Sequence, residues 1–427
     1  MHHLLSRTGN HQPYRPEVDI DRLGDPTGEP HLPSHQLAPL AFRRQSLPLH
    51  RQLRHTAAWL LCGVVVAGCG SDGGTGPTEF DRADLLLLYA PLSQNERATV
   101  LAEWEARDVA VHDVRIELRD TVAVGIDTLE VRILSHLVQG DRHYGALILP
   151  LDAASTPRIV LAYTHFSDVG VSVESTLFAL GAVAGLRGDQ VALVIPSFGG
   201  KSLSFGSNSW ISEGPVSILD GEVDDTLALI HAAWQQPGVI DGQAATIGFS
   251  SGGTIALLTA IREPGVRRVV DFFAPVDFFG PFAQQLLLDI LDDQPPELAS
   301  IPVLQASLID PFERGELSVA QMRLELLRRS ALHFAGRLPL VLAHHGTADR
   351  VVHRAETEAL VAAVEAVGGS IQAYYYSGGD HNPFSLDGSL ARTAAFLGEL
   401  APVAEKVAAT RVPPWGGART LEGLNQP

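Results

Sequence analysis

Short runs of apolar residues alternate with longer amphipathic segments from about residue 158 onward. A continuous apolar run between helical segments is typical of a strand that is buried on both faces of a sheet. The runs that we predict to be strands cover residues 158–163, 191–195, 245–249, 269–274, 338–343 and 371–376. Helices are predicted between them, for example at 175–184 and 221–234. This alternation predicts an α/β protein with a mainly parallel central sheet and helices on both faces.

The chain upstream of this alternation has a different pattern. Residues 84–111 are predicted to be helical, and a short strand is expected at 114–118. Residues 128–137 and 144–149 are predicted to be antiparallel strands, because Gln139-Gly140-Asp141 between them is a turn sequence. A short N-terminal α+β extension therefore leads into the larger sheet, and it carries no recognisable chemistry.

The predicted strand 245–249 runs into Gly248-Phe249-Ser250-Ser251-Gly252. This fits G-x-S-x-G, in which a strand turns sharply into a helix and exposes a serine hydroxyl at the bend. The turn needs small residues two positions before and after the serine, and Gly248 and Gly252 provide them for Ser250. Ser251 would have Phe249 at the first of these positions, so Ser250 is the better candidate nucleophile. The motif alone is weak, since a chain rich in glycine and serine matches it by chance.

Two further strand ends carry the groups that a serine nucleophile needs. Asp349 follows the predicted strand 338–343, and His381 follows 371–376. A histidine takes the serine proton, and a carboxylate orients that histidine and stabilises its charged form. Taken singly, Asp349 is explained as the cap of a helix that begins near Arg354, and His381 as a turn residue. Taken together, in the order Ser, Asp, His at the ends of parallel strands, they predict a catalytic triad.

Residues 144–400 resemble the α/β-hydrolase superfamily, in particular its prolyl-oligopeptidase and dienelactone-hydrolase-like branch. The motifs that carry the resemblance are the turn at 248–253, the HGTADRVV sequence at 345–352 and the GDH sequence at 379–381. The resemblance implies an α/β-hydrolase fold in which Ser250 is the nucleophile, Asp349 the orienting acid and His381 the base.

The resemblance also implies an oxyanion hole made of backbone N–H groups. One donor is expected at Ser251, directly after the nucleophile. The second is expected after the strand 158–163, and we place it at Phe166, where the family usually has a glycine. Any residue except proline has a backbone N–H, so a phenylalanine at this position can still supply the second donor.

A lid is expected between the strands 269–274 and 338–343. The insertion covers about residues 278–337 and contains amphipathic helices at 281–291 and 319–329. Phe278, Phe279 and Phe282 at its start either line a pocket beneath the lid or belong to the core, and the sequence leaves both interpretations open.

The N-terminal region carries the pattern of an exported protein. Arg51 and Arg54 precede an apolar run at 57–66, which ends in the sequence VAGC at 66–69. A basic region, a short apolar run and a small-residue cleavage site indicate a secretory signal peptide. The run is too short for a membrane-spanning helix, which needs about 20 apolar residues. The ending resembles a bacterial lipobox, which implies lipid attachment to Cys69 and a place in the cell envelope. An ordinary signal peptide or a buried helix is the alternative.

These observations predict a chain of several parts. The expected parts are a disordered or wrongly assigned upstream segment (1–50), a signal peptide with a lipobox (51–69), a flexible tether (70–78), an N-terminal extension (79–143), a catalytic domain (144–400) and a tail (401–427). The tether is expected to be flexible because it is rich in glycine and serine.

Composition and charge exclude some classes of function. The formal net charge of −18 argues against nucleic-acid binding, which needs clustered Lys and Arg. Cys62 and Cys69 are the only cysteines, so the body of the chain has no disulfide framework and no cysteine metal cluster. A serine mechanism implies neither a metal nor an organic cofactor.

The predicted function is that of a secreted serine hydrolase that cleaves a carboxylic ester through an acyl-enzyme. A small serine peptidase of the prolyl-oligopeptidase type, acting on short peptides, is the first alternative. It is disfavoured because the chain ahead of the catalytic strands is too short for the propeller of that family. A non-catalytic binding lipoprotein is the second alternative, since a fold does not dictate a function.

Overall fold

The computed structural model describes residues 84–124, 127–165, 170–184, 191–298 and 300–398. The predictions for the signal peptide, Cys69, the tether and the tail fall outside these residues. Phe166, the expected second oxyanion donor, also lies outside them.

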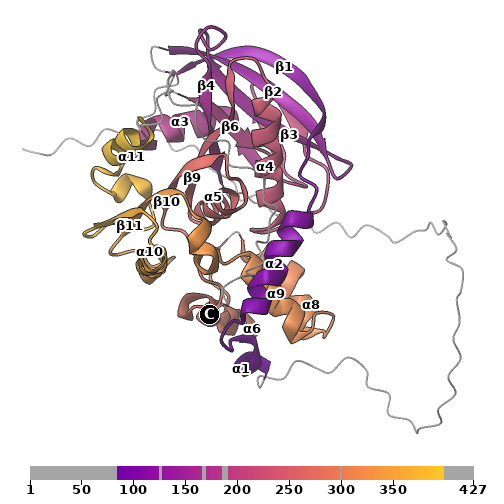
Figure 1. The fold of residues 1–427 in the computed structure, drawn as a ribbon, viewed down its shortest axis with the longest axis vertical. Coiled ribbons are helices and arrows are strands. Elements are labelled where there is room, and N and C mark those ends of the chain that lie inside the picture. The colour runs from indigo at the N-terminus through magenta and orange to yellow at the C-terminus, as the bar shows by residue number, and fades with distance from the viewer. Residues whose placement is uncertain (1–83, 125–126, 166–169, 185–190, 299, 399–427) are drawn as a thin grey trace, which may run out of the picture. The chain divides into compact units, whose positions relative to one another are not determined.

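The centre of the described structure is a nine-stranded sheet with the order β1-β2-β3-β6-β4-β9-β10-β11-β12 (Figure 1). The strands of this sheet are β1 (His112–Val124), β2 (Asp127–Val138), β3 (Asp141–Pro150), β4 (Arg158–Thr164), β6 (Ala192–Pro196), β9 (Val239–Phe249), β10 (Val266–Phe272), β11 (Leu340–Gly346) and β12 (Ile371–Tyr376). Pairing is antiparallel from β1 to β6 and parallel from β6 to β12. The sheet is therefore mainly parallel, as predicted.

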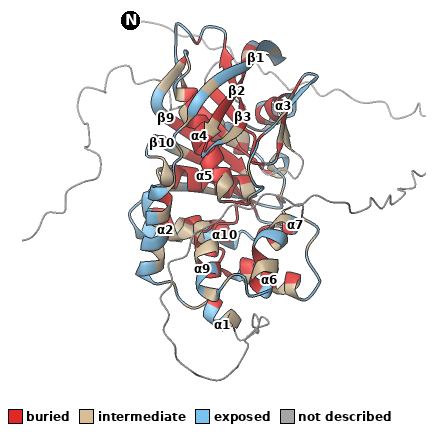
Figure 2. Cartoon of the chain, turned by 90° about the vertical axis from the view of Figure 1, so that its right-hand side faces the viewer, coloured by how far each residue is buried: buried red, intermediate tan, exposed pale blue. Residues whose placement is uncertain are grey.

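Alternate residues of each strand point to opposite sides of the sheet, and both sides are apolar. Helices therefore cover both faces. One apolar core joins Val160 and Val269 to the helices α4 (Gly221–Trp234), α5 (Ser251–Arg262) and α10 (Ala355–Ala366). The other core joins Leu161 and Val270 to α3 (Val173–Ala184) and α11 (Ser389–Gly398). Figure 2 shows α4, α5 and the central strands as largely buried.

Short helices form the insertion between β10 and β11 that was predicted to be a lid, and we call them the cap. Its elements are α6 (Pro281–Leu291), α7 (Ile301–Leu304), η1 (Gln305–Ile309), α8 (Asp310–Glu313), α9 (Val319–Arg328) and η2 (Ala331–Arg337). The N-terminal helices α1 (Asp84–Leu88) and α2 (Gln94–Ala106) pack against α9 (Figure 1). The start of the described chain thus packs against the cap.

One local prediction was wrong, and one small sheet was missed. The single helix expected at 84–111 is two helices, since Pro91 stands between them and lacks the N–H that a helix interior needs. A second, three-stranded sheet of β5 (Gly170–Ser172), β7 (Ser202–Phe205) and β8 (Asn208–Ile211) was not predicted. Its strands are too short and too polar to form an apolar run.

Candidate active site

The turn between β9 and α5 holds Ser250 in a strained conformation. Its φ of 54° and ψ of −127° lie outside the regions that non-glycine residues favour. A Cβ on Gly248 would clash with the carbonyl oxygen of Gly252, and a Cβ on Gly252 would clash with that of Thr164. The requirement for glycine at both positions is therefore confirmed. This backbone projects the Ser250 hydroxyl from the bend at the carboxyl end of the sheet.

The structure brings the three predicted triad residues together. Ser250 Oγ lies 2.9 Å from His381 Nε2, and His381 Nδ1 lies 2.7 Å from Asp349 Oδ2. A carboxylate only accepts hydrogen bonds, so Nδ1 carries the proton in the neutral ring, and Nε2 accepts from the serine. The three catalytic roles themselves stay predictions, but the geometry is that of a serine nucleophile with an oriented base.

Asp349 is fixed by its own loop. Its Oδ1 accepts from the backbone N–H of Val351 at 2.8 Å and of Val352 at 3.0 Å. Burial raises the pKa of Asp349, but the hydrogen bonds from His381 and these N–H groups outweigh burial and hold the pKa below its usual value. The carboxylate is thus kept charged. Asp349 does not cap the following helix, because Arg354 stands at the N-cap of α10.

Two residues near the triad were missed in the sequence. His345 is fully buried, and its ring contacts Thr357 Oγ1 at 2.8 Å and the Val352 carbonyl at 3.0 Å. It thereby supports the loop that holds Asp349. Phe273 packs on the His381 ring with centroids 4.3 Å apart. Its φ of 47° lies in the left-handed region that non-glycine residues rarely adopt. The sequence of the run 269–274 does not indicate this conformation.

Ser251 occupies the first position of α5, where a helical N–H has no acceptor within the helix. The Ser250 carbonyl accepts hydrogen bonds from the N–H groups of Gly253 and Thr254, which lie further along the helix. The role of the Ser251 N–H as an oxyanion donor stays a prediction, and its place at the start of a helix, where the helix dipole favours negative charge, is consistent with that role. Nearby, Thr164 Oγ1 donates to the Gly252 carbonyl at 2.6 Å and so ties the end of β4 to α5.

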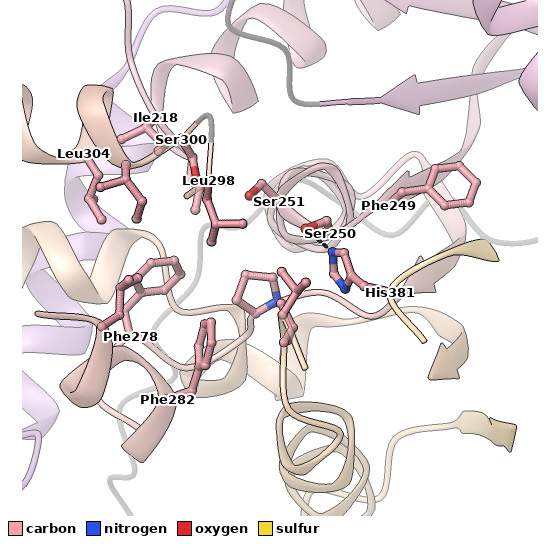
Figure 3. Close-up of a pocket in the computed structure, with 16 residues that line it drawn as sticks. Ile218, Phe249, Ser250, Ser251, Phe278, Phe282, Leu298, Ser300, Leu304 and His381 are labelled. Atoms are coloured by element: carbon pink, nitrogen blue, oxygen red, sulfur yellow. Dashed lines mark hydrogen bonds between the residues drawn. The ribbon is translucent and has the colours of Figure 1, made fainter. Parts of the chain in front are cut away.

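A cavity of about 280 Å³ opens beside Ser250 (Figure 3). Phe278 and Phe282 line it, so both are pocket residues. Phe279 is not in its wall and packs near Tyr89 and His333. The described wall contains no charged side chain other than the titratable His381. The site therefore combines an oriented nucleophile with an apolar chamber.

The described residues contain no group of three or more His, Cys, Asp or Glu side chains arranged to hold a metal ion. None of the helices they form is long and apolar enough to cross a bilayer.

Comparison with known proteins establishes the fold. No protein-family model matches the chain, and no curated protein is similar to it in sequence. Acetyl xylan esterase 1 from Thermoanaerobacterium sp. JW/SL YS485 is similar in structure, with a TM-score of 0.50 and 18% identity. The similarity covers 74% of this chain and 98% of that one. The predicted α/β-hydrolase fold is confirmed, while an identity this low leaves the activity open.

Other similar structures differ in activity. The S-formylglutathione hydrolase from Agrobacterium tumefaciens is 15% identical, and the match covers 67% of this chain and 100% of that one. A puromycin-hydrolyzing peptidase from Mycobacterium tuberculosis is 14% identical, and the match covers 68% of this chain and 49% of that one. Both have a TM-score of 0.43, which is too low to support an inference about substrate.

Proposed function

We propose that the protein is a serine hydrolase that cleaves carboxylic esters. The observation that carries this proposal is the hydrogen-bonded chain from Ser250 through His381 to Asp349 at the wall of an apolar cavity. A nucleophile, a base in the correct tautomer and a buried carboxylate are the parts that acyl transfer requires.

The reaction proceeds in two halves. Ser250 Oγ attacks the ester carbonyl while His381 Nε2 takes its proton, and Asp349 stabilises the imidazolium. The backbone N–H of Ser251 stabilises the negative charge on the former carbonyl oxygen. His381 then protonates the departing alkoxide, which leaves as the alcohol. In the second half, water gives a proton to His381 and attacks the acyl-enzyme. The acid leaves, and Ser250 regains its proton.

An ester fits this site better than a peptide. Enzymes that trim peptide ends need a charged group to hold the terminal amine or carboxylate. The wall of the cavity beside Ser250 offers no acidic or permanently basic side chain for that purpose, and Arg350 and Asp289 line only the adjoining cavity. Upstream of β3, the described chain forms only the helices α1 and α2 and the strands β1 and β2, which join the cap and the sheet. These elements are not a propeller that would restrict entry to short peptides.

Hydrolysis of p-nitrophenyl esters and of alanyl and X-Pro p-nitroanilides by the purified protein tests the proposal. We expect ester turnover that is lost in Ser250→Ala, and a fluorophosphonate probe that labels only the unaltered protein. Anilide turnover of comparable efficiency would assign a peptidase instead. Absence of turnover together with absence of labelling would refute the catalytic role and favour a binding protein.

We also propose that the protein is exported from a bacterial cell and anchored in the envelope through a lipid on Cys69. The support is the sequence alone, namely a basic region, a short apolar run and the VAGC ending at 66–69. Mass spectrometry of the membrane fraction tests this proposal. An unmodified Cys69, or any peptide from residues 1–50, would contradict it.

A further inference from the structure

The cavity beside Ser250 is larger than a short acyl group requires. Its volume of about 280 Å³ corresponds to roughly nine groups of the size of a water molecule. A methylene group is of similar size, whereas an acetyl group would fill only the end next to the nucleophile. The remaining space calls for an apolar occupant.

The far wall of this cavity is apolar and buried. Figure 3 shows Ser250 and His381 at one end, with Leu304 and Ile218 at the other. Leu304 keeps 9% of its surface exposed and Ile218 keeps 3%. A chain that reaches this wall buries apolar surface, so its methylene groups contribute to binding.

A second cavity of about 490 Å³ adjoins the first and has a different lining. The two share Phe282, Leu286, Leu298 and Val351, which places them side by side. The second is also lined by Arg350 and by the polar residues Gln285, Asp289 and His353. It therefore offers a polar group contacts that the far wall of the first cavity lacks.

We infer that the natural substrate is an ester of a medium-length carboxylic acid of roughly six to eight carbons, with a polar alcohol. This inference rests on the proposed function. The acyl chain occupies the apolar cavity, because that cavity alone is lined by Ser250, Ser251 and His381. The alcohol lies in the second cavity, on the Arg350 side of the loop that carries Asp349.

The inference predicts a defined dependence on chain length. Each methylene group that enters an apolar site raises kcat/KM about fourfold. A hexanoyl ester has four more methylene groups than an acetyl ester and should therefore exceed it by about 250-fold. The rise should stop near eight carbons and reverse for longer chains, which no longer fit the cavity.

The test is a series of p-nitrophenyl esters from acetyl to dodecanoyl, with the unaltered protein and with Ser300→Phe. Ser300 lines only the apolar cavity, and its side chain caps no helix. The added ring should fill the cavity and move the optimum toward butanoyl or acetyl. Ser307→Phe is the matched control, since Ser307 lies on the neighbouring helical segment, is exposed and lines neither cavity. It should keep the original optimum.

A preference for acetyl esters, a flat profile or an optimum unmoved by Ser300→Phe would overturn the inference and leave the esterase proposal standing. Alkyl acetates test the opposite assignment. If kcat/KM depends only on the length of the alcohol, the acyl and alcohol cavities are exchanged and the inference is overturned. If Ser300→Phe does not fold, the series with the unaltered protein decides alone. Absence of turnover at every length, with no fluorophosphonate labelling, would instead refute the proposed function.

Discussion

Asp349 binds His381 with one carboxylate oxygen, at 2.7 Å from Nδ1, while its other oxygen accepts two backbone N–H groups of its own loop. The side chain of Asp349 is fully buried, whereas that of His381 keeps 18% of its surface exposed. The carboxylate is thus held rigidly beneath a ring that reaches the cavity. Because the carboxylate accepts the hydrogen bond of the proton-bearing Nδ1, the nitrogen that faces Ser250 is the unprotonated Nε2.

The first prediction follows from this arrangement. Asp349→Asn should lower kcat for ester hydrolysis by about 10⁴-fold, with KM nearly unchanged. An asparagine amide can donate to Nδ1, which then carries no proton, and Nε2 can no longer take the proton of Ser250. The measurement is steady-state kinetics on the best p-nitrophenyl ester.

Circular dichroism and thermal unfolding of Asp349→Asn provide the control, because the amide can still accept the N–H groups of Val351 and Val352. A fall in kcat of less than tenfold in a folded variant would show that Asp349 does not orient the base.

The second prediction concerns the contact between α5 and the end of β4. Gly252→Ala should destabilise the protein by about 1–3 kcal/mol and abolish activity, since the new methyl group would overlap the Thr164 carbonyl and approach His165 Cα at 3.0 Å. Urea unfolding and ester turnover are the measurements. Gly181→Ala on α3 is the control, because nothing lies within 4 Å of the added carbon. It should stabilise the helix by about 0.5–1 kcal/mol. Equal effects of the two substitutions would contradict the steric argument.

The sequence predicted the parallel sheet and the candidate triad because both depend on local patterns. The runs at 245–249 and 371–376 are mostly apolar, so their strands are recognisable without knowledge of their neighbours. Ser250 directly follows the first run, and His381 follows the second after four residues. The order of the strands then brings these positions to one edge of the sheet.

The parts that were missed depend on distant partners. The packing of α2 on the cap relies on the contact of Glu96 with Arg323, and the two residues are separated by most of the described chain. The packing of Phe273 on His381 likewise arises only after folding. No periodicity or motif marks such contacts.

The third prediction concerns a buried acid on β10. Asp271 is fully buried; burial raises its pKa to about 7, and its Oδ2 has no hydrogen-bond partner among the described residues. The unfolded chain has a pKa near 3.9, so between about pH 4 and pH 7 the folded state holds more protons. The free energy of unfolding should therefore fall as the pH rises through this window and level off above it.

Asp271→Asn should remove this part of the pH dependence. The free energy of unfolding of the variant, minus that of the unaltered protein, should be about 2–3 kcal/mol larger at pH 8 than at pH 5. Urea unfolding at the two pH values measures it. The pKa of Glu222 is also raised to about 7 by burial, so a residual slope of the same sign should persist in the variant. Adding Glu222→Gln should reduce that residual slope. An unchanged slope in Asp271→Asn would mean that Asp271 is not protonated in the folded protein.

The fourth prediction concerns Arg323 on α9, which ties α1 and α2 to the cap. Its guanidinium is buried and donates to Glu96 at 2.6 Å and to the carbonyl oxygens of Leu88 at 2.7 Å and Ala90 at 2.8 Å. The hydrogen bond from Arg323 also lowers the pKa of Glu96 to about 2. One side chain thus satisfies several acceptors from the N-terminal segment.

Arg323→Gln should cost about 1–3 kcal/mol in urea unfolding, because it leaves the buried Leu88 carbonyl and the partly buried Ala90 carbonyl and Glu96 carboxylate without their partner. Arg314→Gln is the matched control. Arg314 pairs with Glu316 at 2.6 Å, but both side chains are more than half exposed, so its loss should cost no more than about 1 kcal/mol. If the N-terminal segment packed on the cap through apolar contacts alone, the two substitutions would have similar small effects. A large difference confined to Arg323 would instead establish that this side chain ties α1 and α2 to the cap.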